Sequence, residues 1–541
     1  MVAARLTQVR FWLRAGIAIV LVAALAARAW PYGVAPPGTG AQPTANAPAR
    51  AADEVRILGG EPATLDPVAA GDAGSSGVIA QLFETLTAID PSLTVRPALA
   101  ERWELLQDGR RVVFHLRAGL TFSDGSPLRA EDVVRSWLRI ADPAAPSPLV
   151  ALLLDLQGAD AYLAGEVGPE GVGLRAVENR VEVDLVRPAG EFPSIVASPT
   201  FAVVPPGVGD DPGALDADGF VGSGGYVLSA ASAGGLTLTA NARYWAGPPP
   251  IGTVRLVADL GGRSGVQAFE AGDLDYSSIG DFDATWIRFD PDLGPRLRSV
   301  PALSIEYLGF DTTEPPFGDP RVRRAFAQAV DWNRLVRLAG SSSVIPATSM
   351  VPTGVPGRSD QSFLPEHDPA AARALLAEAG FPEGRGFPEV RYLGNGGTID
   401  AGFVVDVRRE LGVEVRIETI DFAAYSRRLS EEPPDIWSLQ WIADYPGAND
   451  FLGVLLGTGA TNNYGRWSNA EFDAAIRDAG QATDPDEARA AYDRAERILQ
   501  EEAPVIPLAY SPGWALARDG LLGATENGLG SLRFAGLAWD E

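Results

Sequence analysis

Residue types that carry much of enzyme chemistry are absent or scarce in this chain of 541 residues. It has no lysine, so all 44 basic residues are arginine, and it has no cysteine. These absences exclude the P-loop lysine, Schiff-base lysines, thiol nucleophiles, Cys-ligated zinc and disulfides. The only histidines, His115 and His367, are far apart in the sequence, which excludes a metal site built from several histidines. Chemistry based on paired carboxylates is still allowed.

Basic residues are fewer than acidic residues in this chain. The chain has 44 basic and 70 acidic residues, for a net charge of −26. Such a surface disfavours nucleic acid, whose binding depends on basic patches, so we expect no nucleic-acid partner. The length predicts several domains of about 100–200 residues each.

The N-terminal region differs from the rest of the chain. No acidic residue precedes Asp53, and arginines lead into the apolar run AGIAIVLVAALAA (15–27). This run fits the apolar segment of a secretory signal, about 7–15 residues, better than a full membrane span. We predict a signal peptide or an uncleaved membrane anchor over 1–30 and a Pro/Ala/Gly linker over 31–52. The rest of the chain would lie outside the cytoplasm, in the periplasm or at the outer face of the membrane.

Beyond Asp53, strand-like and helix-like segments alternate, which predicts an α/β fold. Residues 110–122 are rich in β-branched and aromatic residues and predict a strand pair, and 130–140 has the apolar spacing of a half-buried helix. Asp-Pro steps predict helices over 319–340, 368–380 and 484–500, with aspartate as the N-cap and proline first in the helix.

A further helix start is predicted at Ser468, with Glu471 completing a capping box. The aspartates and the glutamate at these helix starts are interpreted as structural caps rather than catalytic candidates.

Nine short segments occur in an order typical of one family. Among them are GGEPATLDP (59–67), GSGGY (222–226), DPRVRRAFAQAVD (319–331) and WIADYPGANDFL (441–452). The series resembles the extracytoplasmic oligopeptide- and dipeptide-binding proteins of ABC importers, the peptide/nickel class known as family 5. Two features depart from that pattern: GSGGY lacks the usual proline, and the lipid-accepting cysteine of many relatives is missing.

The resemblance implies a two-lobed α/β fold of the periplasmic-binding-protein type (type II, large peptide-binding subclass) with an extra domain. The lobes would be hinged and would close over a ligand. The implied boundaries are 54–82 with 197–308 and 510–541 for lobe I, 83–196 for the extra domain, and 309–509 for lobe II.

Asp444 is the candidate ligand anchor. In the peptide-binding relatives an acid at the matching position pairs with the α-amino group of the peptide. An unpaired carboxylate in an apolar site is costly, but a closed cleft can supply an ammonium group as its partner. Trp441 and Tyr445 would then form flat walls for the ligand. In the alternative interpretation Asp444 caps its own turn and the two aromatic residues belong to the core.

The opposite end of the ligand is left unassigned. Some relatives meet the peptide carboxylate with a basic residue three positions before the tryptophan, and this chain has Ser438 there. Arg427 and Arg428 lie nearby in the sequence but are interpreted as part of a solvated charged face. Peptide length therefore stays undetermined.

The sequence predicts a receptor rather than an enzyme. It would be a monomeric solute-binding protein that captures peptides and delivers them to the membrane permease of an ABC importer, with no cofactor and no metal. An oligosaccharide or another small solute on the same fold is the alternative. A secreted hydrolase is a third reading, and it would need two acids about 5–10 Å apart across a cleft.

Overall fold

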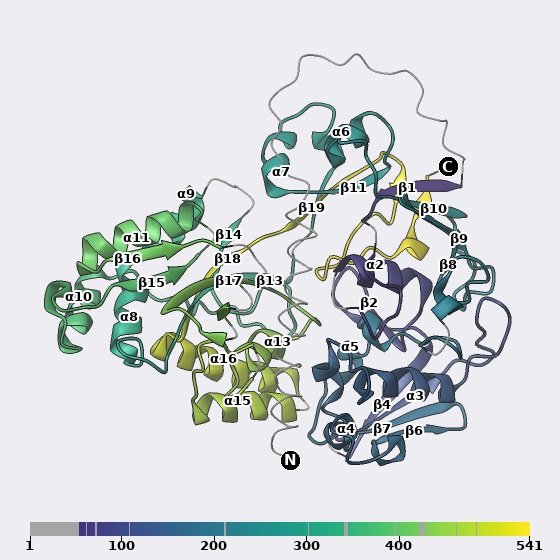
Figure 1. The fold of residues 1–541 in the computed structure, drawn as a ribbon, viewed down its shortest axis with the longest axis horizontal. Helices are drawn as coiled ribbons and strands as arrows, with labels where there is room; N and C mark the ends of the chain where they lie inside the picture. The colour runs from purple at the N-terminus through teal and green to yellow at the C-terminus, as the bar shows by residue number, and fades with distance from the viewer. Residues whose placement is uncertain are drawn as a thin grey trace. The chain divides into compact units, whose positions relative to one another are not determined.

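The computed structural model describes residues 53–540 apart from short gaps. The predicted signal or anchor (1–30) and linker (31–52) lie outside the described residues. No helix in the described part of the chain is long and apolar enough to cross a membrane. The chain divides into two compact units, Met1–Val300 with Gly513–Glu541, and Pro301–Pro512 (Figure 1). The gaps are at 61, 71–72, 108, 210–211, 301, 340–343, 395, 421–424, 426–427, 430, 461 and 483.

The first unit contains a seven-stranded mixed sheet of order β12-β19-β11-β1-β10-β9-β8. Its central strand β1 pairs in parallel with β10 and β11, and the remaining pairs are antiparallel. The strands are β1 (Glu54–Leu58), β8 (Tyr226–Ser232), β9 (Gly235–Ala240), β10 (Thr253–Val257), β11 (Tyr276–Ile279), β12 (Leu297–Val300) and β19 (Gly513–Ala517).

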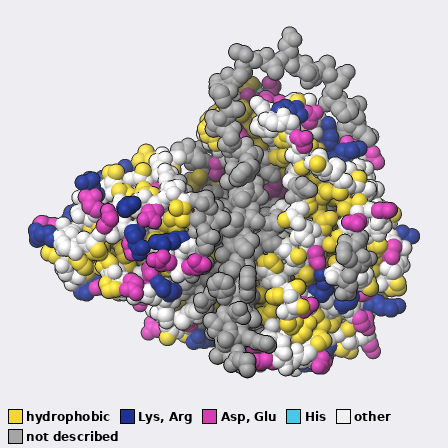
Figure 2. All heavy atoms as spheres, in the orientation of Figure 1, with side chains coloured by type: hydrophobic (Ala, Val, Ile, Leu, Met, Phe, Trp, Pro, Cys, Tyr) yellow, Lys and Arg dark blue, Asp and Glu magenta, His cyan; other side chains and the backbone are white. Residues whose placement is uncertain are grey.

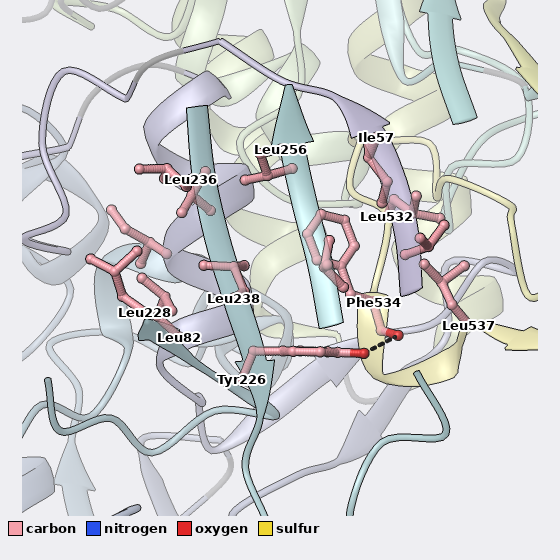
Figure 3. Packing of buried hydrophobic residues seen from close by; sticks show 14 of the residues in the cluster. Ile57, Leu82, Tyr226, Leu228, Leu236, Leu238, Leu256, Leu532, Phe534 and Leu537 are labelled. Atoms are coloured by element: carbon pink, nitrogen blue, oxygen red, sulfur yellow. Dashed lines mark hydrogen bonds between the residues drawn. The ribbon is translucent and has the colours of Figure 1, made fainter. Parts of the chain in front are cut away.

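The C-terminal segment completes the core on this sheet. Figure 3 shows Ile57 of β1 and Leu256 of β10 beside Phe534 and Leu537, from the end of the chain. The buried hydroxyl of Tyr226 donates to the carbonyls of Ile251 (2.9 Å) and Phe534 (3.4 Å). The sheet therefore needs residues from both ends of the chain.

A second sheet in this unit has the order β4-β5-β7-β6 and packs against helix α3. Trp137 of α3 meets Phe114, Phe192 and Phe201 edge-on, with ring centroids 5.2–6.2 Å away. The strands are β4 (Ala100–Leu106), β5 (Arg111–Leu116), β6 (Leu174–Val177) and β7 (Arg180–Asp184). The remaining elements of the unit are α2 (Ala73–Leu82), β2 (Thr87–Ile89), β3 (Val95–Pro97), α3 (Ala130–Leu138), α4 (Ala159–Leu163), α5 (Phe192–Ile195), α6 (Gly265–Glu270), α7 (Asp281–Ile287), β20 (Leu521–Leu522) and β21 (Ala538–Trp539).

The second unit is built on a six-stranded sheet of order β14-β18-β13-β17-β15-β16. Strands β15, β16 and β17 run parallel, and β13 is antiparallel to both β17 and β18. The strands are β13 (Ser304–Phe310), β14 (Ile345–Pro346), β15 (Val390–Leu393), β16 (Val415–Glu418), β17 (Ile436–Ile442) and β18 (Val505–Tyr510). The helices are α8 (Pro320–Ala329), α9 (Trp332–Leu338), α10 (Pro369–Glu378), α11 (Thr398–Leu411), α13 (Ala448–Phe451), α14 (Gly453–Leu456), α15 (Ala470–Gln481) and α16 (Pro485–Glu502).

Glycine lets strand β17 take its place beside β13. Gly309 of β13 pairs with Trp437 of β17, and a Cβ at position 309 would lie 2.5 Å from the indole ring. Because a real Cβ cannot approach an aromatic ring so closely, only glycine at this position leaves room for Trp437. This contact helps to fix the strand that leads to Asp444.

The aspartate caps predicted from the sequence are confirmed. Asp319 accepts a hydrogen bond from the N–H of Arg321 (2.9 Å), Asp368 caps α10 in the same way, and Asp484 accepts from the N–H of Asp486 (2.7 Å). Each satisfies a first-turn donor that has no partner within its helix.

Three local predictions are wrong. The helix predicted over 319–340 ends at Ala329, because Asp331 caps a second helix by accepting from the N–H of Arg334 (2.9 Å). Asn469, rather than Ser468, caps α15, accepting from two first-turn N–H groups at 2.9 and 3.0 Å. The strand pair predicted over 110–122 is a single strand, β5, whose partners are β4 and β7.

Replacing Asp484 tests the cap of the longest helix of the second unit. Asp484→Ala removes the acceptor for the first-turn donors of α16 and should lower the free energy of unfolding by about 1 kcal/mol. Asp484→Asn keeps a good capping side chain and should stay close to the wild type. Urea unfolding followed by circular dichroism measures both; equal losses in the two variants would contradict a capping role.

Candidate ligand-binding site

Strand β17 brings the candidate anchor to an edge of the second unit's sheet. It ends at Ile442, five residues beyond Trp437, which pairs with Leu393 at the end of the parallel strand β15. Asp444 follows two residues later. In open α/β sheets ligands bind outside the carboxyl ends of the strands, so the position suits a binding residue.

The three predicted site residues lie together at this strand end. Asp444 is half-buried, and its side chain makes no hydrogen bond or ion pair with any residue that the structure describes. Trp441 and Tyr445 are buried, with 4% and 3% of their surface exposed. The turn is closed by its backbone, since the N–H of Gly447 donates to the carbonyl of Tyr445 (2.9 Å).

Asp450 of α13 is a site residue that the sequence reasoning missed. It is fully buried. Its Oδ2 accepts a hydrogen bond from the Nε1 of Trp441 (2.8 Å) and a longer one from the backbone N–H of Asp444 (3.3 Å). The only signal in the sequence is an acid six positions after Asp444, in the stretch ANDFL.

A second residue of helix α13 binds the Tyr445 side chain. The Nδ2 of Asn449 donates to the Tyr445 hydroxyl (3.0 Å). Helix α13 therefore contacts Trp441, Asp444 and Tyr445 through two neighbouring residues.

More acidic side chains lie in the same sheet and beside it. Glu306 of β13 pairs with Gln440 of β17. Asp400 of α11, 1% exposed, accepts from the Tyr392 hydroxyl (2.5 Å) and the N–H of Gly396 (2.8 Å). Burial raises the pKa of Glu306 to about 7, and the nearby Asp400 carboxylate adds to the shift. These contacts relate the two acids to each other, and among the described residues no hydrogen bond or ion pair joins either of them to Asp444.

Burial also affects the charge of the candidate anchor. Burial raises the pKa of Asp444 to about 6, since the ionised carboxylate is poorly hydrated where it lies. Arg428 forms its ion pair with Glu432 (2.8 Å) rather than with Asp444, as expected for a residue on a charged face. A cation delivered by a ligand would stabilise the ionised form of Asp444.

Within the described ranges, no group of three or more His, Asp or Glu side chains is placed to hold a metal ion. His115 lies on β5 with Nε2 3.1 Å from Glu104, and His367 is exposed. Asp290 accepts hydrogen bonds from the N–H groups of Asp292 and Leu293 in a turn.

On the face drawn in Figure 2, arginine side chains are scattered among aspartate and glutamate rather than gathered into one broad basic area. This distribution matches the acidic composition of the chain.

Comparison with known sequences gives one consistent result. Residues 94–463 match the family model described as bacterial extracellular solute-binding proteins, family 5. A probable deoxycholate-binding periplasmic protein, YgiS of Escherichia coli, is 32% identical over 477 residues, covering 84% of this chain and 86% of the relative. The oligopeptide-binding protein OppA of Bacillus subtilis is 24% identical over 492 residues, covering 88% and 90%.

Solved structures agree with these sequence matches. The unliganded open form of the periplasmic murein tripeptide-binding protein MppA is 25% identical and has a TM-score of 0.77, covering 90% of this chain and 97% of that one. Haemophilus influenzae OppA in complex with the peptide RPPGFSPFR is 22% identical with a TM-score of 0.72, covering 90% and 99%. The predicted α/β fold of the two-lobed peptide-binding class is confirmed.

The raised pKa of Asp444 predicts how stability depends on pH. Because the pKa in the folded chain (about 6) lies above its ordinary value of 3.8, the folded state holds the proton more tightly. This contribution is present below about pH 4 and is lost as the pH rises through 6. Without ligand, the wild type should therefore lose about 1–3 kcal/mol relative to Asp444→Asn over that range.

Urea unfolding of both proteins at several pH values measures this difference. Glu306→Gln is the matched control, because its difference from the wild type should extend to about pH 7. Parallel stability curves for wild type and Asp444→Asn would contradict the burial of an ionisable Asp444.

Proposed function

Because the chain belongs to the bacterial extracellular solute-binding proteins of family 5, we propose that it is the peptide receptor of an ABC importer. It captures a peptide outside the cytoplasm and delivers it to a membrane permease. Relatives whose names include oligopeptide, murein peptide and di/tripeptide binding support a peptide as the ligand. In this role the protein acts as a binding protein without catalysis and as a monomer, exported or anchored by its N-terminal segment.

The observation that carries this proposal is the Asp444 carboxylate. It lies half-buried at the carboxyl edge of the sheet, and no described residue pairs with it. The α-ammonium group of a peptide supplies the missing positive charge and up to three donors. A hydrogen bond to a charged group contributes about 1.5–3 kcal/mol. The anchor recognises the peptide backbone, so it does not depend on the peptide's sequence.

Trp441 and Tyr445 complete the site in this proposal. Asp450 and Asn449 hold their polar atoms, so the two rings keep fixed orientations beside the anchor. Rigid aromatic surfaces contact varied side chains at little conformational cost. The residues that meet the peptide carboxylate are not assigned.

A bile acid is the second candidate ligand, because the relative at 32% identity has the name of a probable deoxycholate-binding protein. The chemistry of the site argues against it. Deoxycholate carries a carboxylate, and an ionised Asp444 would repel it. A ligand with a cationic end fits this residue better.

The remaining alternatives fit less well. A sugar could donate hydroxyl hydrogen bonds to Asp444, but neutral hydroxyls would leave its charge without a counterion. A carboxylate-pair hydrolase needs two acids that both reach the substrate. Asp450, the acid bonded to the Asp444 turn, is fully buried and cannot take that second role.

Thermal unfolding with a ligand panel tests the proposal. Free peptides at about 100 times their dissociation constant should add about 2.7 kcal/mol of stability. N-acetylated forms of the same peptides should add much less, because acetylation removes the ammonium charge. Asp444→Ala should abolish the difference between free and acetylated forms. Asp473→Ala, which removes a half-buried aspartate on α15, should retain it.

Two outcomes would contradict the proposal. Stabilisation by deoxycholate or by an oligosaccharide, with none by any peptide, would replace the peptide with that ligand. Equal stabilisation by free and acetylated peptides would remove Asp444 from the role of anchor.

A further inference from the structure

Asp450 is a fully buried carboxylate that joins three segments of the second unit. The residue itself belongs to α13, its Oδ2 accepts from the indole of Trp441 on β17 (2.8 Å), and the same oxygen accepts from the backbone of Asp444 in the intervening turn (3.3 Å). One oxygen atom therefore fixes both the aromatic wall and the main chain of the anchor.

Burying a carboxylate such as Asp450 lowers the stability of the fold. Removing a carboxylate from water costs several kcal/mol unless hydrogen bonds replace its hydration. An apolar residue would pack against Trp441 and Phe451 at lower cost. The two hydrogen bonds that Oδ2 accepts both come from residues of the candidate site, which links the buried carboxylate to that site.

The two hydrogen bonds of Asp450 fix the orientation of the groups that donate them. The indole N–H of Trp441 is a single donor, so binding it fixes the rotation of the ring. The bond to the N–H of Asp444 fixes the backbone from which the anchor side chain extends. Site geometry must be held to within about half an ångström for full affinity, and supporting hydrogen bonds are the usual means.

We propose that Asp450 is the positioning residue of the ligand site, which makes the Trp441 wall and the Asp444 anchor act as one unit. This inference rests on the proposed peptide-binding function. It adds Asp450, a residue that does not touch the ligand. Asp450 contributes to recognition of the charged amino end by holding Asp444 in position.

The test compares Asp450→Ala with Asp450→Asn by calorimetric titration of free and N-acetylated peptides. The quantity measured is the ratio of the two affinities. Asp450→Ala removes both hydrogen bonds and should lower this ratio about 10-fold or more. The amide oxygen in Asp450→Asn can still accept two bonds, so the ratio should stay within about fivefold of the wild type.

Asp406→Asn is the matched control. Asp406 of α11 is buried like Asp450 and lies in the same unit. It forms ion pairs with Arg334 of α9 and Arg409 of α11. This variant should lose stability without changing the affinity ratio. A merely structural role for Asp450 would make its variants behave like this control.

A double-mutant cycle supplies the second measurement. If Asp450 acts through the anchor, Asp450→Ala should lower affinity for free peptide strongly in the wild type and little in Asp444→Ala. Where Asp450→Ala fails to fold, Trp441→Phe replaces it, since this change removes the indole donor and keeps an aromatic ring. It should lower the same ratio.

The outcomes separate this inference from the proposed function. A wild type that binds no peptide, or that ignores acetylation, overturns the proposed function. A wild type that discriminates while Asp450→Ala discriminates equally well overturns the positioning role alone. An Asn variant that loses as much as the Ala variant also overturns it, because charge rather than hydrogen bonding would then be the cause.

Discussion

The Asp444 carboxylate, held half out of water with no described counterion, is the constraint on which the candidate site depends. A carboxyl group in that position either meets a cation or tends to keep its proton, and its raised pKa reflects the cost of leaving the carboxylate charged and alone. Ligand binding and proton binding therefore compete for one side chain. The same competition links the pH dependence of the empty protein to the charge of the ligand that fills it.

The fold meets this constraint by placing the carboxylate at the end of an inner strand. Strand β17 pairs with β13 along its whole length and with β15 at Ile436 and Trp437, and Gly309 gives Trp437 the room to pack there. Helix α13 then fixes the turn through Asp450 and Asn449. A rigid strand and a bonded turn limit the freedom of Asp444 to its own side chain, which reduces the entropy lost when a ligand binds.

The sequence predicted what is decided locally and missed what is decided by packing. The caps Asp319 and Asp484 were found because a cap depends on its next three residues alone. The break after Ala329 was missed because the apolar spacing continues across it. The second N-cap, Asp331, therefore does not interrupt the pattern. Asp444 became the candidate anchor through the family resemblance, whereas Asp450 belongs to no motif and was not singled out. Its link to the candidate site is a buried hydrogen bond, which the sequence does not reveal.

Family membership fixes the fold far more firmly than the ligand, since relatives on this fold have names that include oligopeptides, heme and deoxycholate. Sequence identity does not decide among them: the relative at 32% identity has a bile acid in its name, and the one at 24% has a peptide. The choice depends on the charge at the carboxyl edge of the second unit's sheet. There Asp444 has no described partner, and the acid bonded to its turn is Asp450. An anionic steroid would have to overcome this charge, whereas the amino end of a peptide is attracted by it.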